Sequence, residues 1–148
     1  MFLVKDTSPA REARIQAFMV DDPLLAALLA IVHVEWTLRR AIIALGHSPN
    51  TDIRRKLERC HGHDKYRDLW KEEVTPRTGA RLPIVVRNWD GLARAFRLRH
   101  VLVHGVRTVT HDYAADRAQW ALGAAADVHV FCVAHGVDID GRLPVRWR

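Results

Sequence analysis

The chain has 148 residues, 49 % of them apolar, which favours one folded domain over residues 1–148 and excludes a disordered polar chain. Its net charge of +6 and pI near 10.0 favour an anionic partner, with nucleic acid ahead of a membrane surface, although an inert basic surface would have the same charge. Two cysteines, Cys60 and Cys132, cannot make a disulfide framework, so we expect a cytoplasmic protein. Because the first residues soon become charged, we expect no signal peptide.

The first predicted elements are two helices. A short helix is expected from Ser8, with Pro9 at its first position. A long one is expected from Asp22 as N-cap to about Leu45, with Gly46 as a left-handed C-terminal cap.

The long helix, PLLAALLAIVHVEWTLRRAIIAL, is apolar enough to suggest a membrane span. Four polar residues interrupt it, namely His33, Glu35, Arg39 and Arg40. A charge at the bilayer centre costs on the order of 2.5–3.5 kcal/mol even on the most lenient scale. The run therefore predicts the central helix of a soluble bundle, without a membrane partner.

The middle of the chain is expected to be polar helix over 52–74, broken or bent near Gly62, followed by a loop in TPRTGARLP. The next helix is expected from about Pro83 to His104, closed by Gly105. At about 100° per residue its apolar stripe faces the core. This stripe consists of Val85, Trp89, Leu92, Phe96 and Val103.

A last long helix is expected from about Asp112 to His135, closed by Gly136. The end of the chain, VDIDGRLPVRWR, has an Asp-Gly turn between short apolar runs and predicts a small hairpin or an arm. The elements together predict an all-α fold, a bundle of four or five helices.

The stretch RLRHVLVHG, residues 97–105, places charged and titratable groups at the end of a core helix, where they cost free energy unless paired. On a helical projection Arg99, His100 and His104 flank the apolar stripe. If that stripe packs against a second copy across a two-fold axis, Arg99 and His104 of both chains converge in one cleft. The sequence therefore predicts a site at this helix end, and a homodimer.

The segment from Arg99 to His104 resembles the signature of the higher eukaryotes and prokaryotes nucleotide-binding (HEPN) superfamily: an Arg, a polar residue, three further residues and a His. The polar residue is often Asn or Asp in that family and is His100 here. Arg97 also satisfies the looser family spacing, so either arginine fits the motif. Glu35 in VEWTLRRAI is similar to an acidic position on an early helix of several such families.

The resemblance implies a small helical bundle, usually dimeric, and a metal-independent endoribonuclease in toxin–antitoxin or antiviral systems, with no cofactor and with a cognate antitoxin as a further partner. The residue types suit RNA cleavage by the 2′-hydroxyl. A neutral imidazole can take the hydroxyl proton, and a guanidinium can bind two oxygens of the charged transition state. We therefore expect His104 as base or acid, Arg99 as clamp and His100 as a second proton-handling or phosphate-binding group. Glu35 and Arg97 would support them.

Structural interpretations remain open beside this one. His104 could only bond the last-turn carbonyls of its helix, Arg99 could extend from the core edge to solvent, and Glu35 could pair only with Arg39. The alternative function is a catalytically inactive bundle of the same shape that binds nucleic acid or protein. A third is a helical partner whose basic face meets an acidic protein.

Weaker patterns lie elsewhere. The segment CHGH, Cys60 to His63, holds possible zinc ligands, but no second cluster at zinc-site spacing accompanies it, so no metal site is predicted. Trp147 between Arg146 and Arg148 could stack a base or pack on the bundle. Basic side chains of the helix after residue 50 and of the following loop could track phosphates, although a solvated face is as plausible. These RNA-binding candidates are Arg54, Arg55, Lys56, Arg59, Arg77 and Arg81.

Overall fold

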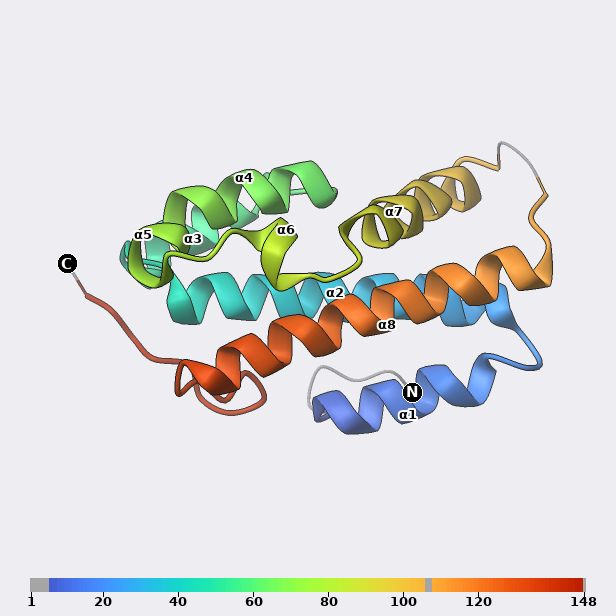
Figure 1. Cartoon of the computed structure of the whole chain (residues 1–148), viewed down its shortest axis with the longest axis horizontal. Helices are drawn as coiled ribbons and strands as arrows, with labels where there is room; N and C mark the ends of the chain where they lie inside the picture. The colour runs from blue at the N-terminus through green and yellow to red at the C-terminus, as the bar shows by residue number, and fades with distance from the viewer. Residues whose placement is uncertain (1–5, 106–107, 148) are drawn as a thin grey trace.

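The structure, a computed structural model, describes residues 6–105 and 108–147, and these residues form eight helices and no strand (Figure 1). The predicted all-α bundle is confirmed, with more helical segments than the four or five expected. Within the described residues, none of the helices combines the length and the apolar character needed to cross a membrane.

Two long helices, α2 (Pro23–Leu45) and α8 (His111–Ala134), lie side by side along the length of the molecule (Figure 1). α1 (Ser8–Phe18) packs against α2 on one side, and α3 (Asn50–Leu57), α4 (His63–Glu73) and α7 (Trp89–Val103) pack on the other. Alanine is frequent among the buried residues of the central pair, and small side chains let two helices approach closely. The buried alanines are Ala26, Ala27, Ala30, Ala41 and Ala44 in α2, and Ala114, Ala118, Ala121, Ala124 and Ala125 in α8.

Local signals in the sequence set most helix ends. The Asp22 side chain accepts a hydrogen bond from the Leu25 N–H at 3.1 Å, which confirms the predicted N-cap of α2. Gly62 (φ +84°) separates α3 from α4, and Gly105 (φ +60°) and Gly136 (φ +73°) follow the ends of α7 and α8. These left-handed positions agree with the predictions, since glycine adopts positive φ without a steric penalty.

The predicted loop TPRTGARLP is partly helical, contrary to expectation. It contains α5 (Thr75–Thr78) and the first two residues of α6 (Leu82–Val85). Each of these short helices has a proline in its first turn, where the missing N–H is tolerated. The helix expected from Pro83 is divided, because Val86 is extended (φ −84°, ψ 105°). Asn88 then caps α7 by accepting from the Gly91 N–H at 2.9 Å, so α7 begins at Trp89.

The apolar stripe of α7 ends earlier than predicted. Leu92 and Phe96 are buried and Val85 and Trp89 are half-buried, but Val103 is 65 % exposed. Val103 lines a surface cleft, described below, and does not reach the core.

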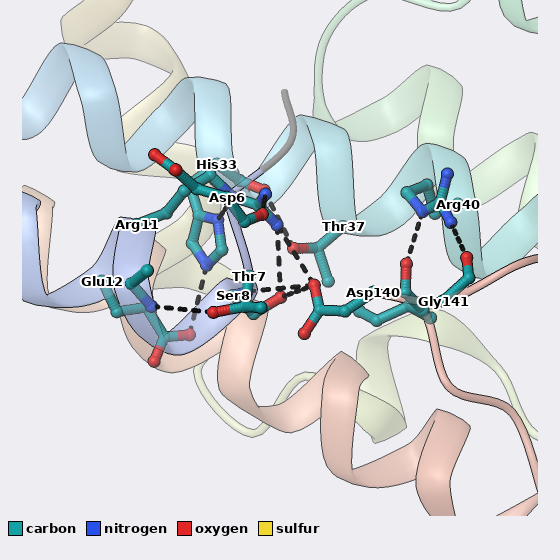
Figure 2. A network of polar contacts seen from close by, with 12 residues as sticks. Asp6, Thr7, Ser8, Arg11, Glu12, His33, Thr37, Arg40, Asp140 and Gly141 are labelled. Carbon is teal, nitrogen blue, oxygen red and sulfur yellow. Dashed lines mark hydrogen bonds and ion pairs between the residues drawn. The ribbon is translucent and has the colours of Figure 1, made fainter. Parts of the chain in front are cut away.

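The C-terminal segment is an arm and not a hairpin, since no strand is formed in the described residues. Its apolar side chains Val137, Ile139 and Leu143 are buried, and Arg40 of α2 donates to the Ile139 and Gly141 carbonyls (Figure 2). Arg146 donates to carbonyls in the last turn of α2, including Ala44 O at 2.9 Å. The arm therefore satisfies acceptors that the end of α2 leaves unpaired.

Gly46 does not form the left-handed cap that was predicted. Its backbone is extended (φ −65°, ψ 159°). A Cβ on Gly46 would lie 2.4 Å from Ile53 Cδ1 and 2.7 Å from the Ile42 carbonyl oxygen. Glycine is required here because the backbone carbonyl of Ile42 and the Ile53 side chain of α3 leave no room for a Cβ, and the carbonyl cannot move without disturbing α2.

We predict that Gly46→Ala lowers the free energy of unfolding by about 1–3 kcal/mol, because the added methyl group would overlap the Ile42 carbonyl and crowd the Ile53 side chain. Gly123→Ala is the matched control, since Gly123 lies in α8 with open space around it. That variant should be neutral or stabilised by about 0.5–1 kcal/mol, because alanine is the better helix former. Urea unfolding measures both, and equal effects of the two substitutions would contradict this account of Gly46.

A buried polar network joins α1, α2 and the arm (Figure 2). Arg11 is 1 % exposed and His33 is fully buried, and the Arg11 Nε–H donates to His33 Nδ1 at 3.2 Å. His33 Nε2 lies 3.1 Å from Glu12 Oε1, so the neutral ring carries its proton on Nε2 and donates it to the carboxylate. Arg11 also forms an ion pair with Asp140 of the arm at 3.5 Å. Burial lowers the pKa of His33, and the hydrogen bond to Glu12 only partly offsets that effect.

Because the folded-state pKa of His33 lies below its unfolded value, the unfolded chain binds more protons at mildly acidic pH. Stability should therefore be complete above the unfolded pKa and fall as the pH drops below it, from about pH 7 to pH 5. Urea unfolding midpoints across this range measure the slope. His33→Gln should flatten this dependence of stability on pH, whereas His111→Gln, at an exposed histidine, should leave the dependence unchanged. An unchanged slope in His33→Gln would assign the pH dependence to other groups.

Candidate functional site

A cleft of about 410 Å³ lies between the end of α7 and the connection from α3 to α4. It brings together the arginines and histidines predicted at the end of α7, and it adds His61 from the connection and His63 from the start of α4. We call it the histidine cleft. Its lining residues are His61, Gly62, His63, Phe96, Arg97, Arg99, His100, Val103 and His104.

Arg99 is held by a carboxylate from the central helix. Its Nη1 donates to Glu35 Oε2 at 2.7 Å, and the Tyr66 hydroxyl donates to Glu35 Oε1 at 3.4 Å. Glu35 is 13 % exposed and Arg99 is 40 % exposed, so the pair spans the boundary between the core and the cleft. The alternative in which Glu35 pairs only with Arg39 is therefore wrong.

His100 and His104 lie one turn apart on α7, with ring centroids 4.4 Å apart. A histidine that only closes a helix end is present elsewhere in this chain: His135 Nδ1 lies 2.8 Å from the Phe131 carbonyl oxygen at the end of α8. In the described part of the chain, the side chain of His104 has no such bond to a carbonyl of α7. Its imidazole is therefore available to a molecule in the cleft.

The two added histidines depend on Arg39. Its Nη1 donates to the Leu57 carbonyl and its Nη2 to the Cys60 carbonyl, each at 3.0 Å, which fixes the α3–α4 connection on α2. The ring of His63 packs 5.8 Å from Trp89 and 6.1 Å from Phe96, measured between centroids. The sequence pattern CHGH drew attention to this segment as a weak metal pattern, but gave no sign that it meets the end of α7.

Cys60 belongs to the core and not to the cleft. Its side chain is buried, and burial raises the pKa of its thiol to about 11, so the thiol stays protonated at neutral pH. Among residues 6–105 and 108–147, no three His, Cys, Asp or Glu side chains are grouped so that they could hold a metal ion.

The histidine cleft suits an anion. None of the described residues that line it is a carboxylate, and Glu35 lies behind Arg99. Arg99 has one polar contact within the described residues, through Nη1, and a guanidinium carries five N–H donors. Arg97 is exposed at the rim. The remaining donors of Arg99 can therefore bind a phosphate while Glu35 fixes the side chain.

None of the predicted RNA-binding residues outside α7 lines this cleft. Lys56 forms ion pairs with Glu72 and Glu73, and Arg77 donates to the Gly46 carbonyl at 3.0 Å. Arg54, Arg55, Arg59 and Arg81 are exposed on the surface.

The aromatic and basic residues at the end of the chain also lie apart from the cleft. Arg146 is engaged with the end of α2, and Trp147 beside it is 82 % exposed. Arg148 lies outside the described residues.

Comparison of the chain with protein-family models, curated proteins and solved structures finds no match.

Proposed function

We propose that this chain is a metal-independent endoribonuclease that cuts RNA by attack of a 2′-hydroxyl on the adjacent phosphorus. The observation that supports this most directly is the composition of the histidine cleft, in which four imidazoles and two guanidinium groups face one hollow. Imidazoles exchange protons near neutral pH, and guanidinium groups stabilise phosphate-centred negative charge.

In the proposed reaction, His104 takes the proton of the 2′-hydroxyl as its oxygen bonds to phosphorus. The bond from phosphorus to the 5′-oxygen breaks, and that oxygen receives a proton from His100, or the two histidines exchange these roles. Arg99, held by Glu35 at 2.7 Å, binds the charged oxygens of the transition state, with Arg97 at the rim in support. The products are a 2′,3′-cyclic phosphate and a 5′-hydroxyl.

The biological role that we propose is a toxin or defence module with a cognate antitoxin, acting in the cytoplasm. It is supported by the resemblance of the segment from Arg99 to His104 to the HEPN signature and by the helical fold that carries it. In the alternative, the same bundle is catalytically inactive and binds nucleic acid or protein through this surface.

We predict that Arg99→Ala and His104→Ala each reduce the cleavage rate at least about a hundredfold, the size expected for loss of a charge clamp or an acid–base group. His135→Ala is the matched control, because His135 also follows a helix end but contacts its own helix. Cleavage of a labelled RNA measures the rates, and circular dichroism checks that the helices are retained.

The same assay tests the mechanism through its products. Cleavage should continue in excess EDTA, and one 2′-deoxy nucleotide before the scissile phosphate should abolish cutting there. Products with a 3′-hydroxyl and a 5′-phosphate would overturn the mechanism, since they require water as nucleophile. If Arg99→Ala retained full activity, Arg99 would not be the group that binds the transition state. Arg97 would then have that role, or neither arginine would. RNA that is bound but never cut would favour the inactive alternative.

We also propose a homodimer through the exposed end of α7. Val103 is 65 % exposed beside the cleft, and its neighbours Val101 and Leu102 are half-buried. A second copy that covers these side chains would remove apolar surface from water and bring two clefts together.

The dimer is tested by light scattering at micromolar concentration, where we predict a dimer for the unmodified chain. Val103→Asp should shift the population to monomer, because a carboxylate at the centre of the contact loses its hydration. Val20→Asp is the control, since Val20 is 84 % exposed and follows α1, away from the cleft. A monomeric unmodified chain would contradict the dimer but leave each single-chain cleft intact.

A further inference from the structure

A second basic hollow, of about 260 Å³, lies between α7 and the start of α8. Three arginines line it: Arg94 and Arg97 from α7, and Arg117 from α8. We call it the arginine hollow. Both helices that build it lie next to one another in Figure 1.

Arg117 is a buried charge that pairs with no carboxylate of the described residues. It is 9 % exposed, and its guanidinium carbon lies 3.1 Å from the ring centroid of Tyr113 and 5.0 Å from that of Trp120. Its Nη1 donates to the Tyr113 carbonyl at 3.2 Å, and its buried Nε has no hydrogen-bond partner in residues 6–105 and 108–147. The two rings hold the guanidinium in place, but they do not neutralise it.

Arg11 shows how the same fold treats a buried arginine with a structural role. Arg11 is 1 % exposed and forms an ion pair with Asp140, as well as a hydrogen bond to His33. Buried charges in proteins are normally paired in this way, because an unpaired one loses its hydration without compensation. The missing partner of Arg117 therefore indicates an anion from outside the chain.

The other two arginines of the hollow are also uncommitted. Arg94 and Arg97 are exposed, and neither forms a hydrogen bond or an ion pair with another described residue. None of the described residues that line the hollow is a carboxylate. Three guanidinium groups around one space fit a phosphate, whose oxygens accept several charge-assisted hydrogen bonds at once.

Arg97 connects this hollow to the proposed active site, because it lines both the arginine hollow and the histidine cleft. A nucleic-acid strand can fill both, because its backbone carries phosphates in series. We propose that the arginine hollow binds a second backbone phosphate of the RNA strand whose scissile phosphate lies in the histidine cleft. This inference rests on the proposed function only in that it takes RNA as the ligand. The hollow would then position the strand for cleavage in the histidine cleft.

The test uses the full chain and a fluorescent octanucleotide of RNA with 2′-O-methyl groups, which cannot be cut by 2′-hydroxyl attack. Anisotropy titrations over a salt series give the affinity and its salt dependence. Arg94→Gln and Arg117→Gln should each weaken binding about tenfold, the loss of one charge-assisted contact. Each should also reduce the slope of log K against log salt by about 0.7, the value for one phosphate on a single strand. Arg142→Gln, with the same change of charge on the exposed arm, is the matched control.

Two further measurements separate a strand from a free anion. A dinucleotide has a single phosphate and cannot occupy the cleft and the hollow together, so Arg94→Gln should weaken its binding less than it weakens binding of the octanucleotide. Inorganic phosphate should compete with the octanucleotide only weakly. Arg117→Gln should keep or raise the urea midpoint of the free protein, because it removes an unpaired buried charge; unfolding of this variant would leave Arg94→Gln to decide.

The proposal would be overturned if Arg94→Gln left the affinity for the octanucleotide unchanged. It would also be overturned if Arg142→Gln reduced that affinity as much as Arg94→Gln does. Tight binding of inorganic phosphate that depends on Arg94, with unchanged RNA affinity, would overturn it in favour of a free anion. If RNA binds as expected but is not cut when its 2′-hydroxyls are restored, the proposed ribonuclease activity is wrong, and the assignment of the hollow as a phosphate subsite stands. If Arg94→Gln and Arg117→Gln cut RNA and bind the octanucleotide as tightly as the unmodified chain, the hollow is not a phosphate subsite, and the proposed ribonuclease activity stands.

Discussion

The central helix α2 is enclosed by other elements along most of its length, and every polar group on it must find a partner there. His33 is bonded by Arg11 of α1, and Glu35 by Arg99 of α7 and Tyr66 of α4. Other partners are backbone carbonyls, which Arg39 and Arg40 reach in the α3–α4 connection and in the arm. The apolar surface of α2 favours burial by any apolar segment. The few hydrogen bonds and ion pairs of its polar side chains determine which segment of the chain covers each part of α2.

The candidate site is a product of the same requirement. Without Arg99, the half-buried Glu35 would keep only the hydroxyl of Tyr66 as a partner, and Arg99 would be free to rotate without Glu35. Because the carboxylate belongs to the most buried helix, the guanidinium is held against a rigid support at the wall of the histidine cleft. Such support is what a site needs if its charge is to meet a transition state without reorganisation.

Much of the fold could be predicted from the sequence, because short-range chemistry determines it. Asp22 caps α2 through its own side chain, and Gly62 and Gly136 supply positive φ where helices separate or end. The motif at the end of α7 was also found, since it lies within eight residues of continuous sequence. Features created by contact between distant segments were not found. The pattern around Gly46 predicts a helix cap, and only the structure places Ile53 against it. Val103 continues the apolar helical spacing of α7 but is exposed. The place of His61 and His63 in the cleft and the unpaired charge of Arg117 have no local signature at all.

The way in which Arg39 holds the α3–α4 connection bears on how this surface can change over evolutionary time. Arg39 bonds to the carbonyl oxygens of Leu57 and Cys60, and every amino acid provides a carbonyl oxygen. Substitutions in the connection can therefore exchange the groups presented to the cleft while the backbone stays in place. A lineage could vary the selectivity of the cleft at His61, which is exposed, without rebuilding the bundle. Arg39 itself has no such freedom, because loss of that one side chain would remove both of these hydrogen bonds.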